Sequence, residues 1–217
     1  MNILAIDTST KDLLLSVKTE SEVFYALSEK SLQHSKILFG ELENLLEKAR
    51  VNKEKIDCIS VNLGPGSFTG IRIGVVFAKG MAYALGTKLV AVDAFEAIGA
   101  EGFSLLPAGI ICEERNGGGY FAIAKCENGN VEISKRGVYT KSEIENILKE
   151  ENITKMLTNA QNDKGWHVVS GINGLLEKAE IAIKNGEFAN ASEIEPVYIK
   201  KSQAEEQLEE KLKKQNA

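Results

Sequence analysis

A glycine-rich segment constrains the fold of this chain more than any other feature: Gly64-Pro-Gly-Ser-Phe-Thr-Gly-Ile-Arg-Ile-Gly74. It follows an apolar run, residues 56–63, that is typical of a buried strand, and it leads into a helix predicted over residues 71–85. The segment lacks the Gly-Lys-Ser/Thr ending of a P-loop, and its third glycine comes one residue late for the dinucleotide fingerprint. It therefore predicts an α/β domain without either of these phosphate-binding motifs.

The turn within this segment has two interpretations. Backbone amides at the start of the following helix can bind an anion, with help from the hydroxyls of Ser67 and Thr69. Alternatively, Gly64 and Gly66 only permit a sharp turn and let the helix approach a neighbouring element closely. Both interpretations stay open at this stage.

A second polar turn, Asp7-Thr8-Ser9-Thr10, follows the first predicted strand. In actin-like ATPases an acid and hydroxyls at this turn hold magnesium and phosphate, because a hard cation requires oxygen ligands. Asp followed by Thr and Ser is also an ordinary turn sequence. Asp7 and Thr8 thus join the residues of the glycine-rich turn as candidates for a nucleotide or anion site, namely Gly64, Gly66, Ser67 and Thr69.

The hydrophobic periodicity predicts an order of elements that matches a ribonuclease H-like domain. Three strands come first, and then helices alternate with strands: strands 2–7, 13–17 and 23–27, helix 35–50, strand 56–63, helix 71–85 and strand 88–92. The second half repeats this order less clearly, with strands near 108–112, 120–126, 131–139, 155–158 and 167–170 and helices over 142–150 and 172–184. We therefore expect a lobe over residues 1–100, a smaller lobe over 101–200 and a charged tail over 201–217.

The tail is rich in Glu and Lys, and its large apolar residues are Leu208 and Leu212. This composition is typical of a solvated helix or a frayed end, and a partner-binding helix is the alternative.

The two long helices of the first half carry the residues expected at a subunit interface. In the first, leucines recur at helical spacing. In the second, a small residue recurs at every fourth position, so that another element can pack at short range, either within the core or from a partner. The interface candidates are Leu38, Leu42, Leu45, Gly70, Gly74, Ala78 and Ala82.

The composition limits the class of protein. Apolar residues make up 43% and charged residues 26% of the chain, as in soluble globular proteins. No uninterrupted apolar run approaches the roughly 20 residues of a membrane span, and no export signal is visible at the N-terminus. The odd number of cysteines, Cys58, Cys112 and Cys126, favours buried reduced thiols and the cytoplasm. The net charge of -5 indicates that any nucleic acid is contacted through a partner.

The sequence offers no catalytic or metal site. Its two histidines, His34 and His167, are far apart, and no pair of cysteines has metal-ligand spacing. No nucleophile-elbow sequence is present. We therefore predict neither a metal site nor catalytic residues.

Several segments, in the same order, resemble the TsaB family, formerly called YeaZ. They are the opening Ile3-Leu-Ala-Ile-Asp-Thr-Ser-Thr10, Gln33-His34-Ser35, the glycine-rich segment, Ala78-Lys79-Gly80, and Pro196-Val-Tyr-Ile-Lys200. The related TsaD transferases carry a His-x-x-x-His pair that binds a metal ion. The matching positions in this chain are Ala94 and Ile98, which cannot ligate a metal.

The resemblance implies an actin/Hsp70/sugar-kinase-like (ASKHA) fold of two ribonuclease H-like lobes, the second reduced. It implies a non-catalytic scaffold that binds a TsaD-like catalytic subunit and acts with a TsaE-like ATPase. Together these transfer a threonylcarbamoyl group to N6 of an adenosine in tRNAs that read codons beginning with A. The scaffold would form a homodimer when alone and contact tRNA only through the complex. It would have no cofactor of its own, although ATP or ADP at a subunit interface is compatible with the resemblance.

Three alternatives differ from this scaffold. An ATP-binding or ATP-hydrolysing enzyme of the same fold would use Asp7 and Thr8 with the glycine-rich turn. A peptidase is disfavoured by the missing histidine pair, and a stand-alone RNA-binding module is disfavoured by the negative net charge.

Overall fold

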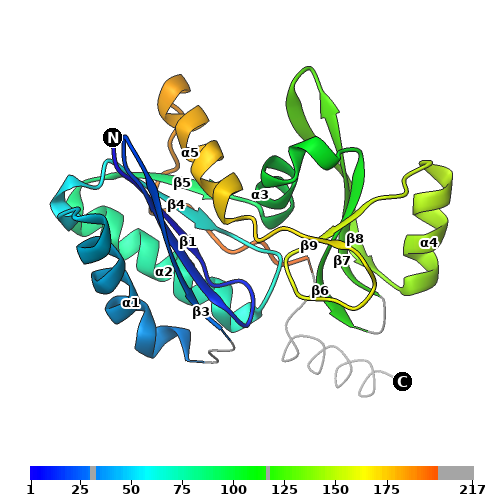
Figure 1. The fold of residues 1–217 in the computed structure, drawn as a ribbon, viewed down its shortest axis with the longest axis horizontal. Helices are drawn as coiled ribbons and strands as arrows, with labels where there is room; N and C mark the ends of the chain where they lie inside the picture. Colours follow the sequence, from blue (N-terminus) through cyan, green and yellow to red (C-terminus); the bar gives the residue numbers. More distant parts are fainter. Residues whose placement is uncertain (30–32, 116–117, 200–217) are drawn as a thin grey trace, which may run out of the picture.

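The computed structural model describes residues 1–29, 33–115 and 118–199. The tail predicted over 201–217, with Leu208 and Leu212, lies outside the described residues. Two five-stranded mixed sheets lie side by side, each with helices packed on it (Figure 1). This mixed α/β architecture confirms the predicted fold class.

The first sheet has the order β3-β2-β1-β4-β5. The strands β1 (Ile3–Asp7), β2 (Leu13–Lys18) and β3 (Val23–Ser28) form an antiparallel meander. β4 (Cys58–Asn62) and β5 (Lys88–Val92) then extend the sheet in parallel with β1. Every residue of β1 and β4 is buried, because helices cover both faces of these central strands. This is the predicted ribonuclease H-like order.

The second sheet repeats the topology of the first, with the order β10-β9-β6-β7-β8. β6 (Ala108–Arg115), β7 (Gly118–Glu127) and β8 (Asn130–Tyr139) form the meander, and β9 (Met156–Thr158) and β10 (His167–Val168) extend it in parallel. The first lobe has a long helix between its last two strands, whereas residues 159–166 of the second lobe contain none. The second lobe is therefore reduced, as predicted.

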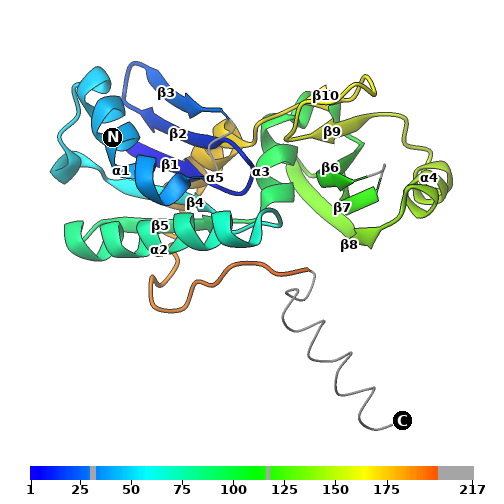
Figure 2. The same cartoon turned by 90° about the horizontal axis from the view of Figure 1, so that it is seen from below.

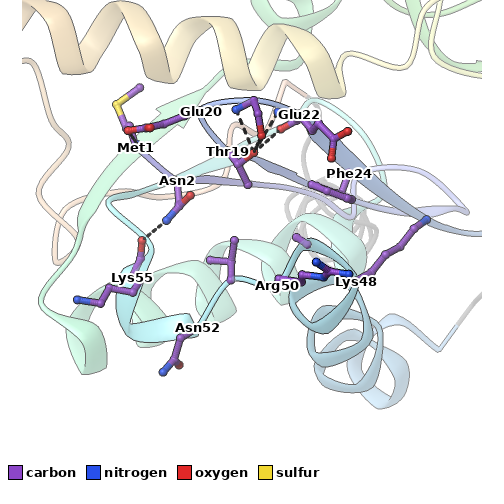
Figure 3. A pocket seen from close by; sticks show the side chains of 13 residues that line it. Met1, Asn2, Thr19, Glu20, Glu22, Phe24, Lys48, Arg50, Asn52 and Lys55 are labelled. Atoms are coloured by element: carbon purple, nitrogen blue, oxygen red, sulfur yellow. Dashed lines mark hydrogen bonds and ion pairs between the residues drawn. The ribbon is translucent and has the colours of Figure 1, made fainter.

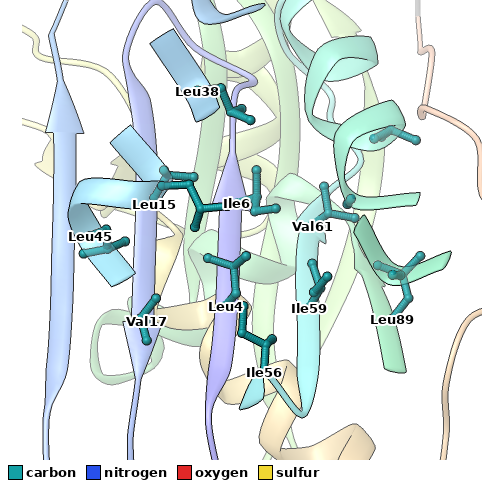
Figure 4. Close-up of a cluster of buried hydrophobic side chains, with 14 of the residues drawn as sticks. Leu4, Ile6, Leu15, Val17, Leu38, Leu45, Ile56, Ile59, Val61 and Leu89 are labelled. Carbon is teal, nitrogen blue, oxygen red and sulfur yellow. The ribbon is translucent and has the colours of Figure 1, made fainter. Parts of the chain in front are cut away.

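Two helices cover one face of the first sheet: α1 (His34–Ala49) and α2 (Phe68–Leu85). Short 3-10 turns follow α1 and α3, at Lys53–Lys55 and Phe103–Leu105. The leucines of α1 point onto the sheet, where Leu38 and Leu45 contact the same apolar cluster as Ile6 and Leu15 (Figure 4). The leucines that recur every three or four residues in α1 thus mark the face of the helix that packs on the core.

Two of the remaining helices, α3 and α5, connect the two lobes. α5 (Ile172–Asn185) follows the second sheet but covers the other face of the first one, where Leu175 packs on Ile3 and Ala5 (Figure 1). α3 (Ala94–Glu101) follows the first sheet but packs on the second, and α4 (Lys141–Glu150) covers the opposite face of that sheet. Because α3 and α5 each pack on the other lobe, a domain boundary near residue 100 stays a prediction.

The sequence interpretation missed α3 as a helix. Asp93 caps it, because its Oδ1 accepts a hydrogen bond of 2.8 Å from the amide of Phe95. Asp93 followed three residues later by Glu96 is the helix-start signal in the sequence. Ala94 and Ile98 of α3 are buried in the core of the second lobe.

Residues 187–199, here called the strap, run along α2 and join the two lobes (Figure 2). The amide of Ala189 donates to the carbonyl of Leu89 on β5 (2.8 Å), and the amide of Val197 donates to the carbonyl of Leu63 (2.8 Å). Beyond these contacts, Ile199 packs against the core of the second lobe. The strap thus holds the described part of the Pro196–Lys200 motif next to the start of α2.

The cysteines only partly match the expectation of buried thiols. Cys58 and Cys112 are buried, but Cys126 is exposed because it lies near the β7–β8 turn, beyond the helices that cover the sheet. Burial, with a smaller contribution from Asp57, raises the pKa of Cys58 to about 11. Burial and then the nearby Asp93 raise the pKa of Cys112 well above its ordinary value.

We expect a single fast thiol in the native protein. At pH 8 a disulfide reagent such as DTNB should react rapidly with Cys126, because only a thiolate that reaches the reagent is nucleophilic. Cys58 and Cys112 should react only after unfolding in guanidinium chloride. A Cys126→Ser variant should abolish the fast phase, and a second thiol that reacts quickly in this variant would contradict the described burial.

Candidate functional site

The structure brings the two polar turns of the sequence together at the carboxyl edge of the first sheet. Asp7 ends β1 and is 1% exposed. One carboxylate oxygen accepts a hydrogen bond from the amide of Ser9 (2.7 Å), and the other accepts from Nδ2 of Asn62 (2.8 Å). Burial raises the pKa of Asp7, and the hydrogen bonds from Ser9 and Asn62 oppose that shift. Both oxygens of this carboxylate are therefore already engaged within the protein.

The glycine-rich turn packs directly on the turn that follows Asp7. Thr8 Oγ1 donates to the carbonyl of Gly70 (2.7 Å), and the amide of Ser67 donates to the carbonyl of Ser9 (2.7 Å). A Cβ at Gly66 would collide with the carbonyl oxygen of Ser9. These contacts explain the glycines, because only a residue without a Cβ lets the two turns pack this closely.

The other candidates of this turn lie close by. The amide of Gly64 donates to Asn62 Oδ1 (2.8 Å), and Ser67 Oγ accepts from the amide of Gly70 (3.3 Å) as the N-cap of α2. Thr69 is exposed on the first turn of α2. The candidates thus share one edge of the sheet, but the hydrogen bonds of Asp7, Thr8, Gly64 and Ser67 serve the fold. A role in nucleotide or anion binding stays a prediction.

Sequence reasoning missed two residues of this cluster. Asn62 forms hydrogen bonds with Asp7, Ser9 and Gly64. In the sequence, its position as a polar residue at the end of an apolar strand is the one indication of this role. His34 is buried, and its Nε2 lies 3.0 Å from the carbonyl oxygen of Thr10. The other histidine, His167, is exposed. Within residues 1–29, 33–115 and 118–199, no group of three or more His, Cys, Asp or Glu residues is placed to hold a metal ion.

The seven interface candidates face the interior of the first lobe. All seven are buried in the isolated chain, and direct contact of these residues with a partner stays a prediction: Leu38, Leu42, Leu45, Gly70, Gly74, Ala78 and Ala82. Gly70 and Gly74 face the Thr8 turn, where a Cβ would collide with Thr8 atoms. The burial of these residues is explained by packing within the lobe, because the apolar or small face of a helix packs on its own sheet. A partner-binding role for the two helices stays a prediction.

Other residues of these two helices form an exposed apolar surface. Phe39 of α1 is 65% exposed, and Val76 and Tyr83 of α2 are 69% and 89% exposed. Phe77, partly buried, packs edge-on against Phe39 with ring centroids 4.8 Å apart. We call Phe39, Val76, Phe77 and Tyr83 the α1–α2 surface. Large exposed apolar side chains on two adjoining helices favour an interaction site on a soluble protein.

α2 also has the length and hydropathy of a membrane-crossing helix. It is the one helix among the described residues with this property, and 33% of it is buried in the structure. Core helices of soluble proteins have the same property, so this is weak evidence for a membrane span.

A cavity of about 760 Å³ lies at the opposite edge of the first sheet, by the start of β1 (Figure 3). The turn between β2 and β3 contributes Glu20 and Glu22 on one side, and the end of α1 contributes Lys48 and Arg50 on the other. Cations at a helix C-terminus have a structural explanation, because they stabilise the helix dipole. None of the predicted site residues lines this cavity.

Comparisons with known proteins agree with the architecture. A family model described as "TsaD: tRNA N6-adenosine threonylcarbamoyltransferase" matches residues 28–112. The chain is 22% identical to the tRNA threonylcarbamoyladenosine biosynthesis protein TsaB of Haemophilus influenzae, over 92% of this chain and 94% of that protein. It is 33% identical to TsaB of Bacillus subtilis, over 61% of this chain and 58% of that protein.

Two solved structures share the fold of the chain. A Pseudomonas aeruginosa protein described as uncharacterized, with similarity to the peptidase YEAZ, superposes with a TM-score of 0.73 at 20% identity and covers 92% of this chain and 99% of its own. YeaZ from Pseudomonas aeruginosa superposes with a TM-score of 0.70 at 20% identity, over 91% of this chain and 99% of its own. The chain is therefore similar over most of its length to TsaB of Haemophilus influenzae, and it shares the fold of the YeaZ structure.

Proposed function

We propose that this protein acts in the formation of N6-threonylcarbamoyladenosine in tRNA, as a non-catalytic scaffold for a TsaD-like transferase. The observation that carries the proposal is the α1–α2 surface, which leaves Phe39, Val76 and Tyr83 exposed on two adjoining helices. Burial of each such side chain contributes roughly 1.5–3 kcal/mol. A partner that covers the surface would gain this free energy on binding.

The scaffold role rests on which residues the chain has at the positions of the TsaD metal ligands. Ala94 and Ile98 occupy them, and both are buried in an apolar core. A TsaD-like partner would therefore supply the metal and the transfer chemistry, and a TsaE-like ATPase would act with the two. The substrate tRNA would reach this chain only through the complex, since the net charge is -5.

The same surface offers a route to self-association. Two copies can bury their α1–α2 surfaces against each other reciprocally, as in an isologous dimer with two-fold symmetry. We propose a cytoplasmic homodimer when the TsaD-like subunit is absent, with the two partners competing for one surface. ATP or ADP at a subunit interface remains part of the proposal, and no cofactor of its own is assigned to the chain.

Reconstitution of the transfer reaction tests the proposed function. The TsaD-like subunit and TsaE-like ATPase of the same organism are incubated with ATP, threonylcarbamoyl-AMP and an unmodified tRNA that reads codons beginning with A. We expect modified nucleoside only when this protein is added, and no turnover of Mg-ATP by this protein alone. Equal product without it, or ATP hydrolysis by the isolated chain, would refute the scaffold assignment.

A further inference from the structure

Arg72 is held in one orientation on the outward side of α2. Its guanidinium carbon lies 4.0 Å from the ring centroid of Phe68 and 5.4 Å from that of Tyr198. Its Nε donates a hydrogen bond of 2.7 Å to the hydroxyl of Tyr198. The ring centroids of Phe68 and Tyr198 are 4.5 Å apart. Phe68 begins α2 and Tyr198 belongs to the strap, so two segments distant in sequence fix the guanidinium between them.

The charge of Arg72 has no carboxylate partner among the described residues, and the hydrogen bond to Tyr198 uses only Nε. Arg72 also lies near the N-terminus of α2, whose first turn contains no acid. A cation at this end of a helix is disfavoured by the helix dipole, so helix stability does not explain the residue. An uncompensated, oriented guanidinium on an acidic protein is instead suited to bind an anion.

We propose that Arg72 anchors a carboxylate of the protein partner that docks on the α1–α2 surface, and that Tyr198 is the positioning residue that orients it. The proposal rests on the proposed function and specifies the chemistry of the partner: apolar side chains opposite Val76 and Tyr83, and an Asp or Glu one turn away, opposite Arg72. An arginine that is already ordered loses less conformational entropy when it forms a two-pronged bond to a carboxylate.

The observations favour a protein carboxylate over a nucleic-acid phosphate. The exposed residue one turn after Arg72 is Val76, and the intervening Ile73 is apolar and partly buried. Phosphate backbones are bound by several cations together, and the net charge of the chain is -5. A single arginine beside exposed apolar residues is the usual composition of a protein–protein contact.

Calorimetric titration of the TsaD-like subunit at several salt concentrations tests the proposal. Arg72→Gln should weaken binding about tenfold or more and flatten its salt dependence. Tyr198→Phe keeps the ring but removes the hydroxyl, so we expect a smaller loss of roughly threefold with the salt dependence retained. Arg72→Lys keeps the charge, so the salt dependence of binding should remain, but the affinity should stay below that of the wild type. Lys164→Gln is the matched control, because Lys164 stacks on Trp166 in the second lobe and its loss should leave binding unchanged.

The outcomes separate this proposal from the function on which it rests. If Val76→Glu abolishes binding while Arg72→Gln leaves the affinity and its salt dependence unchanged, the anchor is wrong and the docking surface stands. If Arg72→Gln weakens tRNA binding by the complex but not assembly of its subunits, a phosphate and not a carboxylate is the ligand, and the proposal fails. If the wild-type protein does not bind the TsaD-like subunit, the proposed function itself fails. Equal melting temperatures of the variants exclude unfolding as the cause.

Discussion

A Gly70→Ala variant is expected to lose about 2–3 kcal/mol of unfolding free energy, the upper range for forcing an extra group into a packed core. The added Cβ would collide with the carbonyl oxygen of Thr8, which belongs to the backbone and cannot rotate away. It would also separate Thr8 Oγ1 from the carbonyl of Gly70, which are 2.7 Å apart. The joint between the end of β1 and the start of α2 would therefore have to shift.

The same helix provides a matched control. Gly80 is exposed, and a Cβ built there meets no atom within 4 Å. Gly80→Ala should therefore gain up to about 1 kcal/mol from the higher helix propensity of alanine. The unfolding free energies of both variants are compared by urea denaturation. The slope of the free energy against urea concentration should be the same in both. Equal stability of Gly70→Ala and Gly80→Ala would contradict the close packing described for the glycine-rich turn.

A Val76→Glu variant is expected to weaken binding of the TsaD-like subunit by about 100-fold or more, while its unfolding free energy stays within about 0.5 kcal/mol of wild type. Val76 is 69% exposed, so the new carboxylate remains in water in the free protein. At an apolar interface that carboxylate would be buried without a partner, which costs several kcal/mol. The same change should shift a homodimer towards monomers in light scattering.

Val138→Glu is the control for this effect. Val138 lies on β8 of the second lobe and is 49% exposed, so the substitution has the same chemistry at a distance from the α1–α2 surface. Its affinity for the TsaD-like subunit should equal that of the wild type. Loss of affinity in both variants would indicate a general effect of charge, and unchanged affinity in Val76→Glu would exclude α2 as the contact.

The order of elements could be predicted from the sequence because each long element carries its own periodicity. The spacing of Leu38, Leu42 and Leu45 marked α1, and the apolar run before Gly64 marked β4. α3 escaped because a helix of eight residues with buried residues all around it has no polar face to reveal its period. Its Asp93 cap was the remaining local signal.

The candidate site could be predicted only at the level of helices. The apolar stripe of α1 and the small residues of α2 are the pattern that a sheet selects, so they identify the inner faces. Phe39, Val76 and Tyr83 lie off that stripe, and a single exposed aromatic or valine is not distinctive in a sequence. Only the folded arrangement shows that Phe39 and Phe77, from different helices, meet at the surface.

The Asp7 cluster could not be assembled from the sequence for a different reason. Asp7 and its partner Asn62 are 55 residues apart, and nothing local to either residue indicates the other. The parallel pairing of β1 with β4 places them together at the same edge of the sheet. Turn chemistry alone therefore could not distinguish a ligand-binding carboxylate from one engaged by its own fold.

Photo-crosslinking from position 83 is the most direct test that the α1–α2 surface binds the catalytic partner. Tyr83, 89% exposed on α2, is replaced by p-benzoylphenylalanine in living cells, with position 138 of β8 as the reference site. We expect light to join position 83 to the TsaD-like subunit, or to a second copy of this chain when that subunit is depleted. Adducts with the TsaD-like subunit from position 138 and none from position 83 would contradict the assignment of this surface.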